Sequence, residues 1–346
     1  MKARTKKLLI VLGTIVFIWS IFAIAPRPKS VSGVNSLVIE PGTRPILIAH
    51  GGGNKEFPDN TLEAFYHAYS IDEYAMMETD VSITKDGVVI LTHDTTLDRK
   101  TMLINAPVIE INYSDLIDNE VNFAFHNNVS PNSNGFNVSG EFFEYRNYLG
   151  EAVTPLNVSY PEGILPRHTS IFLATTLEEL ITSFPNNYIN VEIKQTGGTG
   201  LLALSKVIEL MDELDEEYNT YHRIVLASFH TEVYQEMIRL QKTTHPTLKY
   251  SPEYTGVVKF FALQTLLLDI FYNDKVTVLQ VPTDQYGLSL STKMFIKTAH
   301  RHNIAVHYWT IDDPDEMRRL IENGADGIMT NVPSILKQVY DEIFGE

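Results

Sequence analysis

The chain opens with a long apolar run behind a short basic flank. Residues 8–25, LLIVLGTIVFIWSIFAIA, carry no charge over 18 positions, and four Lys or Arg residues precede them. This length is close to the minimum that crosses a bilayer, and it exceeds what a buried helix at a chain end needs. We therefore expect residues 1–30 to form a basic flank and a transmembrane anchor.

The basic flank also predicts the orientation of this anchor. Lys and Arg beside a membrane span stay in the cytoplasm, so we expect a single-pass membrane protein whose remaining residues are extracytoplasmic. A cleaved signal peptide is the alternative, because Ala23 and Ala25 form a small-residue cleavage pattern, although Pro26 follows directly and disfavours the cut. A buried helix of a soluble core is the third interpretation.

Beyond a polar linker at residues 31–43, short apolar runs alternate with runs of helical period. The predicted strands are residues 46–50, 76–80, 188–194, 223–228, 247–250, 276–281, 304–309 and 327–330. The predicted helices are residues 61–70, 177–184, 200–217, 231–241, 291–302 and 314–323. Eight strands with helices between them predict an α/β fold, a closed parallel (β/α)8 TIM barrel over residues 44–346.

Two segments depart from this rhythm. Residues 88–92 read as a further strand, but only Lys85, Asp86 and Gly87 separate them from the strand before, which allows a hairpin and not a parallel crossover. Residues 95–170 are too long for an ordinary barrel connection, and their middle is rich in Asn, Ser, Gly and aromatic residues. We expect an inserted cap after the second strand.

The amino-acid composition limits which metal sites and which partners the chain can have. The chain has no cysteine, which excludes disulfides and thiolate metal sites. A bound metal would be held by oxygen or imidazole, and this indicates a divalent cation, Ca²⁺ or Mg²⁺. The net charge of −16 argues against nucleic acid as a partner, because nucleic acid is bound mainly through its phosphates.

Acidic residues stand at the ends of two predicted strands. Glu78 and Asp80 are two positions apart, as are Glu192 and Lys194. Residues at this spacing share a strand face, and barrel active sites are built at the carboxyl ends of the strands. Three converging carboxylates repel one another unless a cation joins them, so we expect a metal site. The alternative is that each pair forms salt bridges with nearby Lys or Arg.

Two histidines follow strands at the same end. His50 precedes three glycines, Gly51 to Gly53, where backbone can approach a ligand closely. His93 ends the predicted hairpin and is followed by Asp94, which could orient its ring. Two proton carriers of near-neutral pKa suit acid and base catalysis at phosphorus, although a single histidine at a strand end is more often structural.

These segments resemble the glycerophosphodiester phosphodiesterase family. The shared pattern starts at the strand-end histidine, His50. It continues through Glu-x-Asp at residues 78–80, His-Asp at residues 93–94 and Glu-x-Lys at residues 192–194. Further motifs in the same order are Pro58-Asp59-Asn60-Thr61, Thr84-Lys85-Asp86-Gly87, Trp309-Thr310 and GADGIMTNVP at residues 324–333. The resemblance spans about residues 46–335.

The resemblance implies an enzyme that hydrolyses glycerophosphodiesters to glycerol 3-phosphate and an alcohol. It implies that a hydroxyl of the substrate's own glycerol attacks phosphorus and that a cyclic phosphate is hydrolysed afterwards. The implied roles are general acid–base catalysis for His50 and His93, metal binding for Glu78, Asp80 and Glu192, phosphate binding for Lys194, and a pocket wall for Trp309.

Three positions depart from the family pattern. Gly51 stands where an arginine is usual, so only backbone is offered to the phosphate there, and Arg99 and Arg167 are substitutes to consider. Asp59 replaces a glutamate, which puts a direct metal contact in doubt, and Asn331 replaces an acid. A catalytically weak barrel that binds phosphoesters is therefore an alternative function.

Residues 256–272, GVVKFFALQTLLLDIFY, are unusually apolar for a barrel helix. At helical spacing Phe260, Leu263, Leu267 and Phe271 share one face. An ordinary core helix is one interpretation, and a membrane-touching helix that guides lipid to the site is the other. The second makes lysophospholipids possible substrates, through a lysophospholipase D-like activity.

Overall fold

A computed structural model describes residues 3–124 and 145–345. The predicted barrel is confirmed. Its strands are β1 (Ile46–His50), β2 (Met76–Ile83), β4 (Ile189–Ile193), β5 (Ile224–Ala227), β6 (Lys249–Tyr250), β7 (Val278–Val281), β10 (Ala305–Tyr308) and β11 (Gly327–Thr330). They are hydrogen-bonded in the order β6-β5-β4-β2-β1-β11-β10-β7, and all these pairs are parallel.

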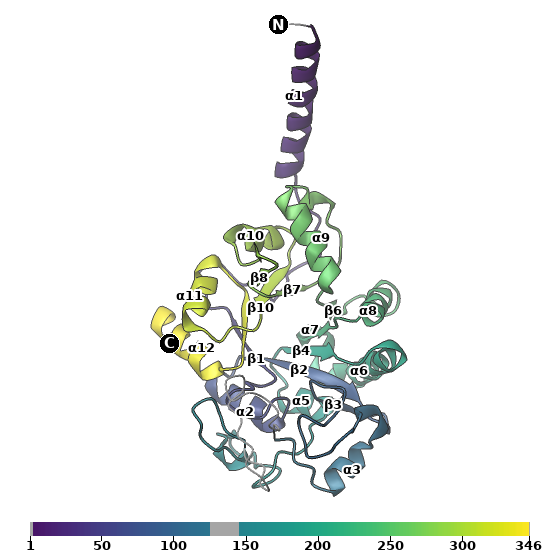
Figure 1. Cartoon of the computed structure of the whole chain (residues 1–346), viewed down its shortest axis with the longest axis vertical. Helices are drawn as coiled ribbons and strands as arrows, with labels where there is room; N and C mark the ends of the chain where they lie inside the picture. The colour runs from purple at the N-terminus through teal and green to yellow at the C-terminus, as the bar shows by residue number, and fades with distance from the viewer. Residues whose placement is uncertain (1–2, 125–144, 346) are drawn as a thin grey trace.

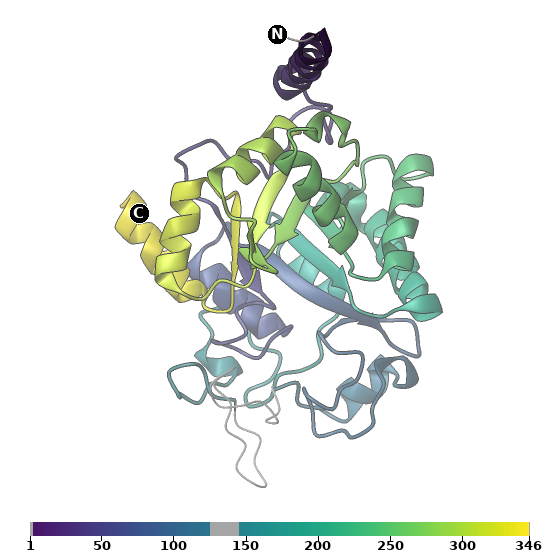
Figure 2. The ribbon, with the colours of Figure 1, turned by 45° about the horizontal axis from the view of Figure 1, so that its top comes forward.

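The two end strands of this order meet. Thr277, directly before β7, donates its backbone N–H to the carbonyl oxygen of Tyr250 in β6 at 3.0 Å. The sheet therefore curves round into a barrel (Figures 1 and 2). Its strands are almost wholly buried, as expected for parallel strands with side chains packed inside the barrel and helices packed outside it.

Helices cover the outside of the barrel (Figure 2). They are α2 (Leu62–Ile71), α5 (Leu177–Ser183), α6 (Gly197–Tyr218), α7 (Thr220–Arg223), α8 (Thr231–Thr243), α9 (Tyr254–Thr265), α10 (Lys293–Arg301), α11 (Pro314–Asn323) and α12 (Pro333–Phe344). The sequence prediction missed α12, which begins at Pro333 just after the last strand. The short β8 (Asp284–Gln285) and β9 (Leu288–Ser289) form a hairpin beyond β7.

The predicted hairpin after the second strand is also present. β3 (Val89–Leu91) pairs antiparallel with the far end of β2. Thr92 then donates its backbone N–H to the backbone carbonyl oxygen of Asp80 at 2.8 Å, which returns the chain to the level of the strand ends. This turn places His93 beside the acids of β2.

The inserted segment carries η1 (Val108–Glu110), α3 (Tyr113–Asp118) and η2 (Pro155–Asn157). Its first part has a small apolar core around Leu97, Leu116 and Phe123. Tyr145 donates its hydroxyl to the carbonyl oxygen of Asn54 at 2.8 Å, which fastens the second part beside the strand ends. Residues 125–144 of the predicted cap lie outside the described residues.

At the other end of the barrel, Ser30 and the residues 31–43 predicted as a linker pack on the strand starts. Ser30 N–H is bonded to the carbonyl oxygen of His302 at 2.8 Å, and the Asn35 side chain is bonded to the carbonyl oxygens of Thr277 and Asn303. Leu37 is fully buried against side chains of the barrel interior. This segment therefore closes the amino-terminal end of the barrel.

Helix α1 (Ala3–Ile24) leaves this closing segment and projects away from the barrel (Figure 1). Its stretch Thr5–Phe22 is long and apolar enough to cross a membrane, and none of it is buried. The prediction that residues 256–272 present one apolar helical face is wrong, because α9 ends at Thr265, Leu267 has a left-handed φ of +55 and Phe271 lies in the separate short helix η3 (Asp269–Phe271). Phe260 is also fully buried and packs edge-on against Phe295. Phe260 is therefore a core residue.

Candidate active site

A cavity of about 290 Å³ opens at the carboxyl ends of the barrel strands. Its lining comes from strands that are far apart in the sequence. The lining residues include His50, Glu78, His93, Asn190, Glu192, Lys194, Ser228, Phe229, Gln280 and Trp309. The structure thus brings both predicted histidines, two predicted acids, the lysine and the tryptophan to one cavity.

A cluster of three carboxylates lies at its base. Glu78 and Asp80 project from β2, and Glu192 of β4 is paired in register with Asp80. One oxygen from each lies within 4.8 Å of the others. The i, i+2 spacing produces this cluster because alternate residues of a strand share a face.

Burial and mutual repulsion shape the electrostatics of these acids. Burial and the neighbouring Asp80 raise the pKa of Glu78 to about 7. Burial also raises the pKa of Glu192, although Lys194 opposes it. Asp80 has a lowered pKa because Lys194 and the two histidines outweigh its burial. A buried acid with a pKa near neutrality beside other charged groups is typical of a functional site.

Lys194 partly neutralises this cluster. Its Nζ lies 3.0 Å from Asp80 Oδ1 and 2.8 Å from Glu192 Oε1. These carboxylates raise the pKa of Lys194 against the effect of burial, so the amine is charged. Lys194 therefore lines the cavity beside Glu78 and Glu192, and phosphate binding by Lys194 stays a prediction.

The carboxylate cluster fits a hard divalent cation. Three acids converge on one point, and Asp80 Oδ1 receives no well-directed hydrogen bond although it is buried. All the atoms that the cluster offers to a cation are carboxylate oxygens, which Ca²⁺ and Mg²⁺ prefer as ligands. The salt-bridge alternative accounts for Asp80 and Glu192 through Lys194, but among the described residues it leaves Glu78 with His50, at 3.9 Å, as its one ion-pair partner.

His50 is held from behind by Asn331. Its Nδ1 lies 2.6 Å from Asn331 Oδ1, and Asn331 Nδ2 donates to Asp312 Oδ2 at 2.7 Å. Since the amide nitrogen faces Asp312, the amide oxygen faces His50, and Nδ1 carries the hydrogen. Burial lowers the pKa of His50, but Glu78 and Asp80 raise it further than burial lowers it. Its Nε2 is therefore the atom turned toward the acids.

His93 is held instead by a carboxylate. Its Nδ1 lies 2.8 Å from Asp94 Oδ1, and this hydrogen bond raises the pKa of the ring. Arg99 is bonded to the other oxygen of Asp94, and the pKa of Asp94 falls to about 2 despite partial burial. Asp94 therefore orients the ring, as the sequence suggested.

Asp59 lies beside the carboxylate cluster but is paired with cations. Lys100 contacts its backbone oxygen and lies 3.4 Å from Oδ1, and Arg99 lies 3.3 Å from Oδ2. These cations outweigh burial and lower the pKa of Asp59. Lys100 is fully buried and comes from the inserted segment, a link that the sequence analysis missed. A metal contact by Asp59 stays a prediction.

Gly51 takes part in the site through its backbone. Its N–H donates to Glu78 Oε2 at 2.9 Å, so it positions a carboxylate, and a phosphate contact at Gly51 stays a prediction. The neighbouring Gly52 has φ +85, and a Cβ there would lie 2.7 Å from Ala64 Cβ. Glycine is required there because the loop packs directly on α2.

Neither substitute arginine lines the cavity. Arg99 supports Asp94 and Asp59, while Arg167 is paired with Glu63 and Glu179. Lys194 is therefore the cation that faces the cavity directly.

An aromatic pair forms the outer wall. The rings of Trp309 and Phe229 are 6.1 Å apart in an edge-to-face arrangement. Phe229 is 56% exposed and lies two residues beyond the end of β5. The sequence analysis named Trp309 and missed Phe229, although a phenylalanine directly after the predicted strand 223–228 was a usable signal.

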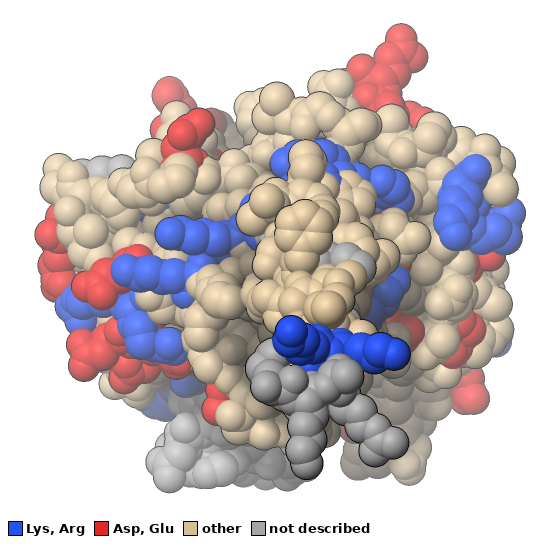
Figure 3. All heavy atoms as spheres, turned by 90° about the horizontal axis from the view of Figure 1, so that it is seen from above, with Lys and Arg blue, Asp and Glu red and all other residues tan. Residues whose placement is uncertain are grey.

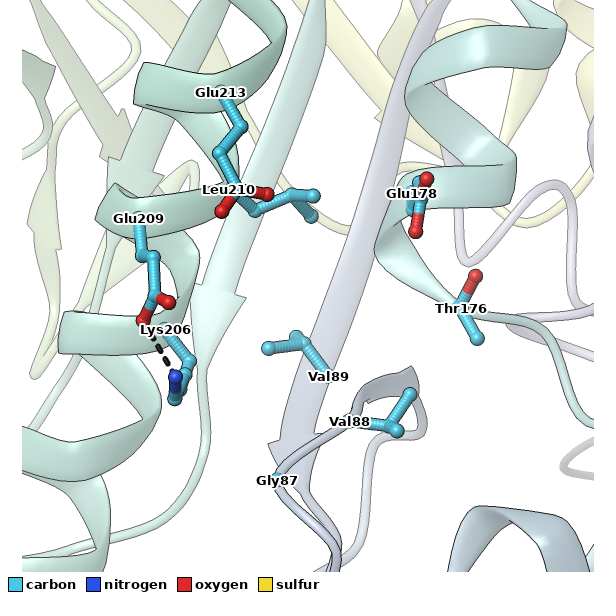
Figure 4. A pocket seen from close by; sticks show the side chains of 9 residues that line it. All are labelled: Gly87, Val88, Val89, Thr176, Glu178, Lys206, Glu209, Leu210 and Glu213. Atoms are coloured by element: carbon cyan, nitrogen blue, oxygen red, sulfur yellow. Dashed lines mark hydrogen bonds and ion pairs between the residues drawn. The ribbon is translucent and has the colours of Figure 1, made fainter.

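A second cavity of about 230 Å³ lies elsewhere on the barrel, between the β2–β3 turn and helices α5 and α6 (Figure 4). Its lining includes three glutamates and one lysine, Lys206, whose Nζ lies 2.5 Å from Glu209. No histidine lines it, so it does not offer the proton carriers of the first cavity.

Comparison with known proteins gives a consistent result. A family model described as "Glycerophosphoryl diester phosphodiesterase family" matches residues 50–335. Human "Lysophospholipase D GDPD1" is 25% identical over 307 residues, which cover 84% of each chain. A glycerophosphodiester phosphodiesterase from Caldanaerobacter subterraneus is 24% identical over 84% of this chain and 96% of its own.

Solved structures share the fold. A putative glycerophosphoryl diester phosphodiesterase from Silicibacter pomeroyi superposes with a TM-score of 0.61, at 19% identity, over 89% of this chain and 96% of its own. A phosphodiesterase from Oleispira antarctica, solved with the product sn-glycerol-3-phosphate, gives a TM-score of 0.55 at 16% identity, over 86% and 97% of the two chains.

Proposed function

Because this chain belongs to the glycerophosphoryl diester phosphodiesterase family, we propose that it hydrolyses glycerophosphodiesters to glycerol 3-phosphate and an alcohol with the help of a divalent cation. The observation that carries this proposal is one cavity lined by two histidines, a lysine and two acids of the three-carboxylate cluster. Acids to hold a cation, bases to move protons and a cation for the phosphate are what phosphodiester hydrolysis needs.

Glu78, Asp80 and Glu192 would hold the cation, either Ca²⁺ or Mg²⁺. When bound, the cation would stabilise negative charge that develops on the phosphate oxygens. Lys194 would add a second positive charge from the adjacent side of the cavity, since its amine already faces the lining. Trp309 and Phe229 would pack against the apolar faces of the substrate.

The two histidines would divide the proton transfers. The hydrogen bond to Asn331 leaves Nε2 of neutral His50 free to take the proton from the attacking glycerol hydroxyl. The carboxylate behind His93 favours its protonated form, which would give a proton to the leaving alcohol. The cyclic phosphate formed in this way would then be opened by water, with the two proton transfers reversed.

This mechanism uses a nucleophile that the substrate itself supplies. The hydroxyl is already close to phosphorus, so the protein needs to supply only charge and proton transfer. The loss of the family arginine at Gly51 removes a phosphate donor but none of these groups. We therefore favour catalysis over the alternative of a phosphoester-binding barrel.

A direct test is product analysis with the full chain purified in detergent. Glycerophosphocholine and lysophosphatidylcholine are each incubated with Ca²⁺, Mg²⁺ or a chelator, and the products are followed by phosphorus NMR. Glycerol 3-phosphate from glycerophosphocholine supports the proposal. No phosphate-ester cleavage under any metal condition supports the binding role instead.

A second activity, hydrolysis of lysophospholipids, is favoured by the relative named lysophospholipase D and by the apolar helix α1.

We also propose that α1 is an uncleaved anchor with the barrel on the extracytoplasmic side. Supporting this, Arg27 donates to the carbonyl oxygens of Phe22 and Ala25 while its guanidinium is paired with buried Asp269. The helix end is thus bound to the domain, which disfavours access to a peptidase.

A further inference from the structure

The contacts at the base of α1 determine where a bilayer lies on the barrel. Trp19 Nε1 donates to the carbonyl oxygen of Leu266 at 3.0 Å, and the ring of Phe22 lies 5.4 Å from that of Phe271, edge to face. Trp19 and Phe22 belong to the apolar stretch Thr5–Phe22 itself. The turn after α9 therefore stands beside the last turn of the span.

This proximity leaves little room between barrel and membrane. A helix rises about 1.5 Å per residue, so Trp19 lies only about 8 Å from the end of α1 at Ile24. A bilayer that covers Thr5–Phe22 must then reach the turn that carries Leu266 and Phe271. Tryptophan is also a typical residue of the membrane–water interface.

The surface beside the span suits this position. Leu266 is 58% exposed and Phe271 is 56% exposed, large apolar side chains that add to the uncovered surface of α1. Lys29 and Lys275 are also exposed there and are linked, because Lys275 Nζ donates to the carbonyl oxygen of Lys29 at 2.7 Å. Figure 3 looks down on this face from above and shows Lys and Arg side chains at several places around it.

A buried charge network holds α1 to the barrel at this point. The Arg27 guanidinium lies 2.5 Å from Asp269 of η3 (Asp269–Phe271), and the side chains are 0% and 2% exposed. His302, also fully buried, lies 3.3 Å from the same carboxylate. Removing one partner of a buried ion pair leaves an uncompensated charge, so this network ties the end of α1 to the barrel.

The joint lies at the opposite end of the barrel from the cavity. Residues 27–39 cross the amino-terminal ends of the strands, whereas His50, Glu192 and Trp309 lie at or just beyond the carboxyl ends. Figure 1 looks along the barrel, with the helices in a ring around the strands, and it shows α1 leaving the side of this ring beyond α9 and α10, across from the inserted segment. A strand of five residues spans about 16 Å, so the cavity is separated from the joint by the depth of the barrel.

We propose that the side of the barrel formed by the turn after α9 rests on the lipid bilayer through Leu266 and Phe271, and that the active-site mouth opens to the aqueous phase and not to the lipid. This inference rests on the proposed anchor, and it specifies the substrate of the proposed activity. A water-soluble glycerophosphodiester, such as glycerophosphocholine, reaches the mouth directly. A lipid in the bilayer that anchors the enzyme has to leave that bilayer before it meets the cavity.

The absence of cysteine from the chain permits a clean test. Single variants Leu266→Cys and Phe271→Cys probe the proposed contact, and Ile104→Cys and Leu165→Cys, 81% and 83% exposed in the inserted segment, are matched controls. Each full-length variant carries an environment-sensitive fluorophore and is reconstituted into phosphatidylcholine vesicles with or without brominated acyl chains. All four positions are exposed, so the fold is expected to tolerate them, and a thermal melt confirms it.

The expected result is bromine quenching at positions 266 and 271 and none at positions 104 and 165. Quenching at 104 or 165 would overturn the proposal, since the mouth would then face the lipid. No quenching at any position, or release of the labelled chain from vesicles, would overturn it as well. The measurement needs no turnover, so its failure is distinct from failure of the proposed activity.

Discussion

His50 and Asn331 are joined by a hydrogen bond of 2.6 Å between Nδ1 and Oδ1. Asn331 stands where the family usually has an acid, and its amide is in turn held by Asp312, which Lys55 contacts at 3.0 Å. The negative charge of Asp312 therefore acts on His50 through the Asn331 amide, whereas an acid at position 331 would contact the ring directly. This arrangement fixes the ring while leaving the amide neutral.

Replacing Asn331 tests whether this bond positions a catalytic base. Asn331→Leu removes the acceptor for Nδ1, so the ring can rotate and present the wrong nitrogen. We expect kcat to fall by about 10²-fold with little change in KM, because misplacing a reacting group costs rate more than binding. Steady-state kinetics on glycerophosphocholine measure this.

Asn331→Asp is the informative companion variant. It restores an acceptor for Nδ1 and should recover much of the lost kcat. If Asn331→Leu leaves kcat unchanged, His50 is not positioned through this bond.

Removal of the second proton carrier should be more severe. His93→Ala deletes the group proposed to protonate the leaving alcohol, and a loss of about 10²–10⁴-fold in kcat is expected. A substrate with a more acidic leaving group, such as a p-nitrophenyl ester, should lose less because it needs no proton. An equal loss on both substrates would contradict the role of His93 as general acid.

Metal binding should compete with protons. Glu78 has a pKa raised to about 7 by burial and by Asp80, and its carboxylate must lose the proton to bind a cation. The apparent affinity for Ca²⁺ or Mg²⁺ should therefore weaken as the pH falls through about 7, with proton uptake when the metal is removed by chelation. Calorimetric titration in buffers of different ionisation enthalpy measures both; a pH-independent affinity between pH 6 and pH 8 would count against Glu78 as a ligand.

Lys100 should be a structural requirement of the site. Lys100→Met leaves Asp59 without its buried partner, and we expect a loss of about 3–5 kcal/mol in the free energy of unfolding. The folded-state pKa of Asp59 is lowered, so its stabilising effect is present above about pH 4 and is lost as the pH falls further. Denaturant melts at neutral pH measure the loss.

The double variant Asp59→Asn with Lys100→Met provides the control. It removes both charges and should recover part of the lost stability. If the stability lost in the double variant equals the sum of the losses in Asp59→Asn and Lys100→Met, the two residues are not coupled.

Much of the barrel could be predicted from the chain itself. Each strand is a short buried run, and a buried parallel strand leaves a continuous apolar signature. Residues 46–50 are an example, since the observed β1 has these bounds. The hairpin of β2 and β3 followed from Lys85, Asp86 and Gly87, a connection too short for a crossover.

The contacts made by residues far apart in sequence could not be predicted in this way. Lys100 reads as an ordinary surface lysine in a polar stretch, and only folding of the inserted segment buries it on Asp59. Phe260 fits the exposed face of an amphipathic helix equally well, but packing against Phe295 buries it. Periodicity predicts which residues share a face and leaves open what that face meets.

We propose above that the three-carboxylate cluster binds a cation required for phosphodiester hydrolysis at this cavity. The most direct measurement is the rate of glycerol 3-phosphate release from glycerophosphocholine by Glu78→Gln at saturating Ca²⁺ or Mg²⁺, with the exposed Glu216→Gln as a matched control. We predict that Glu216→Gln keeps the wild-type rate and that Glu78→Gln loses metal binding and nearly all turnover. Wild-type turnover by Glu78→Gln under either metal would contradict the account.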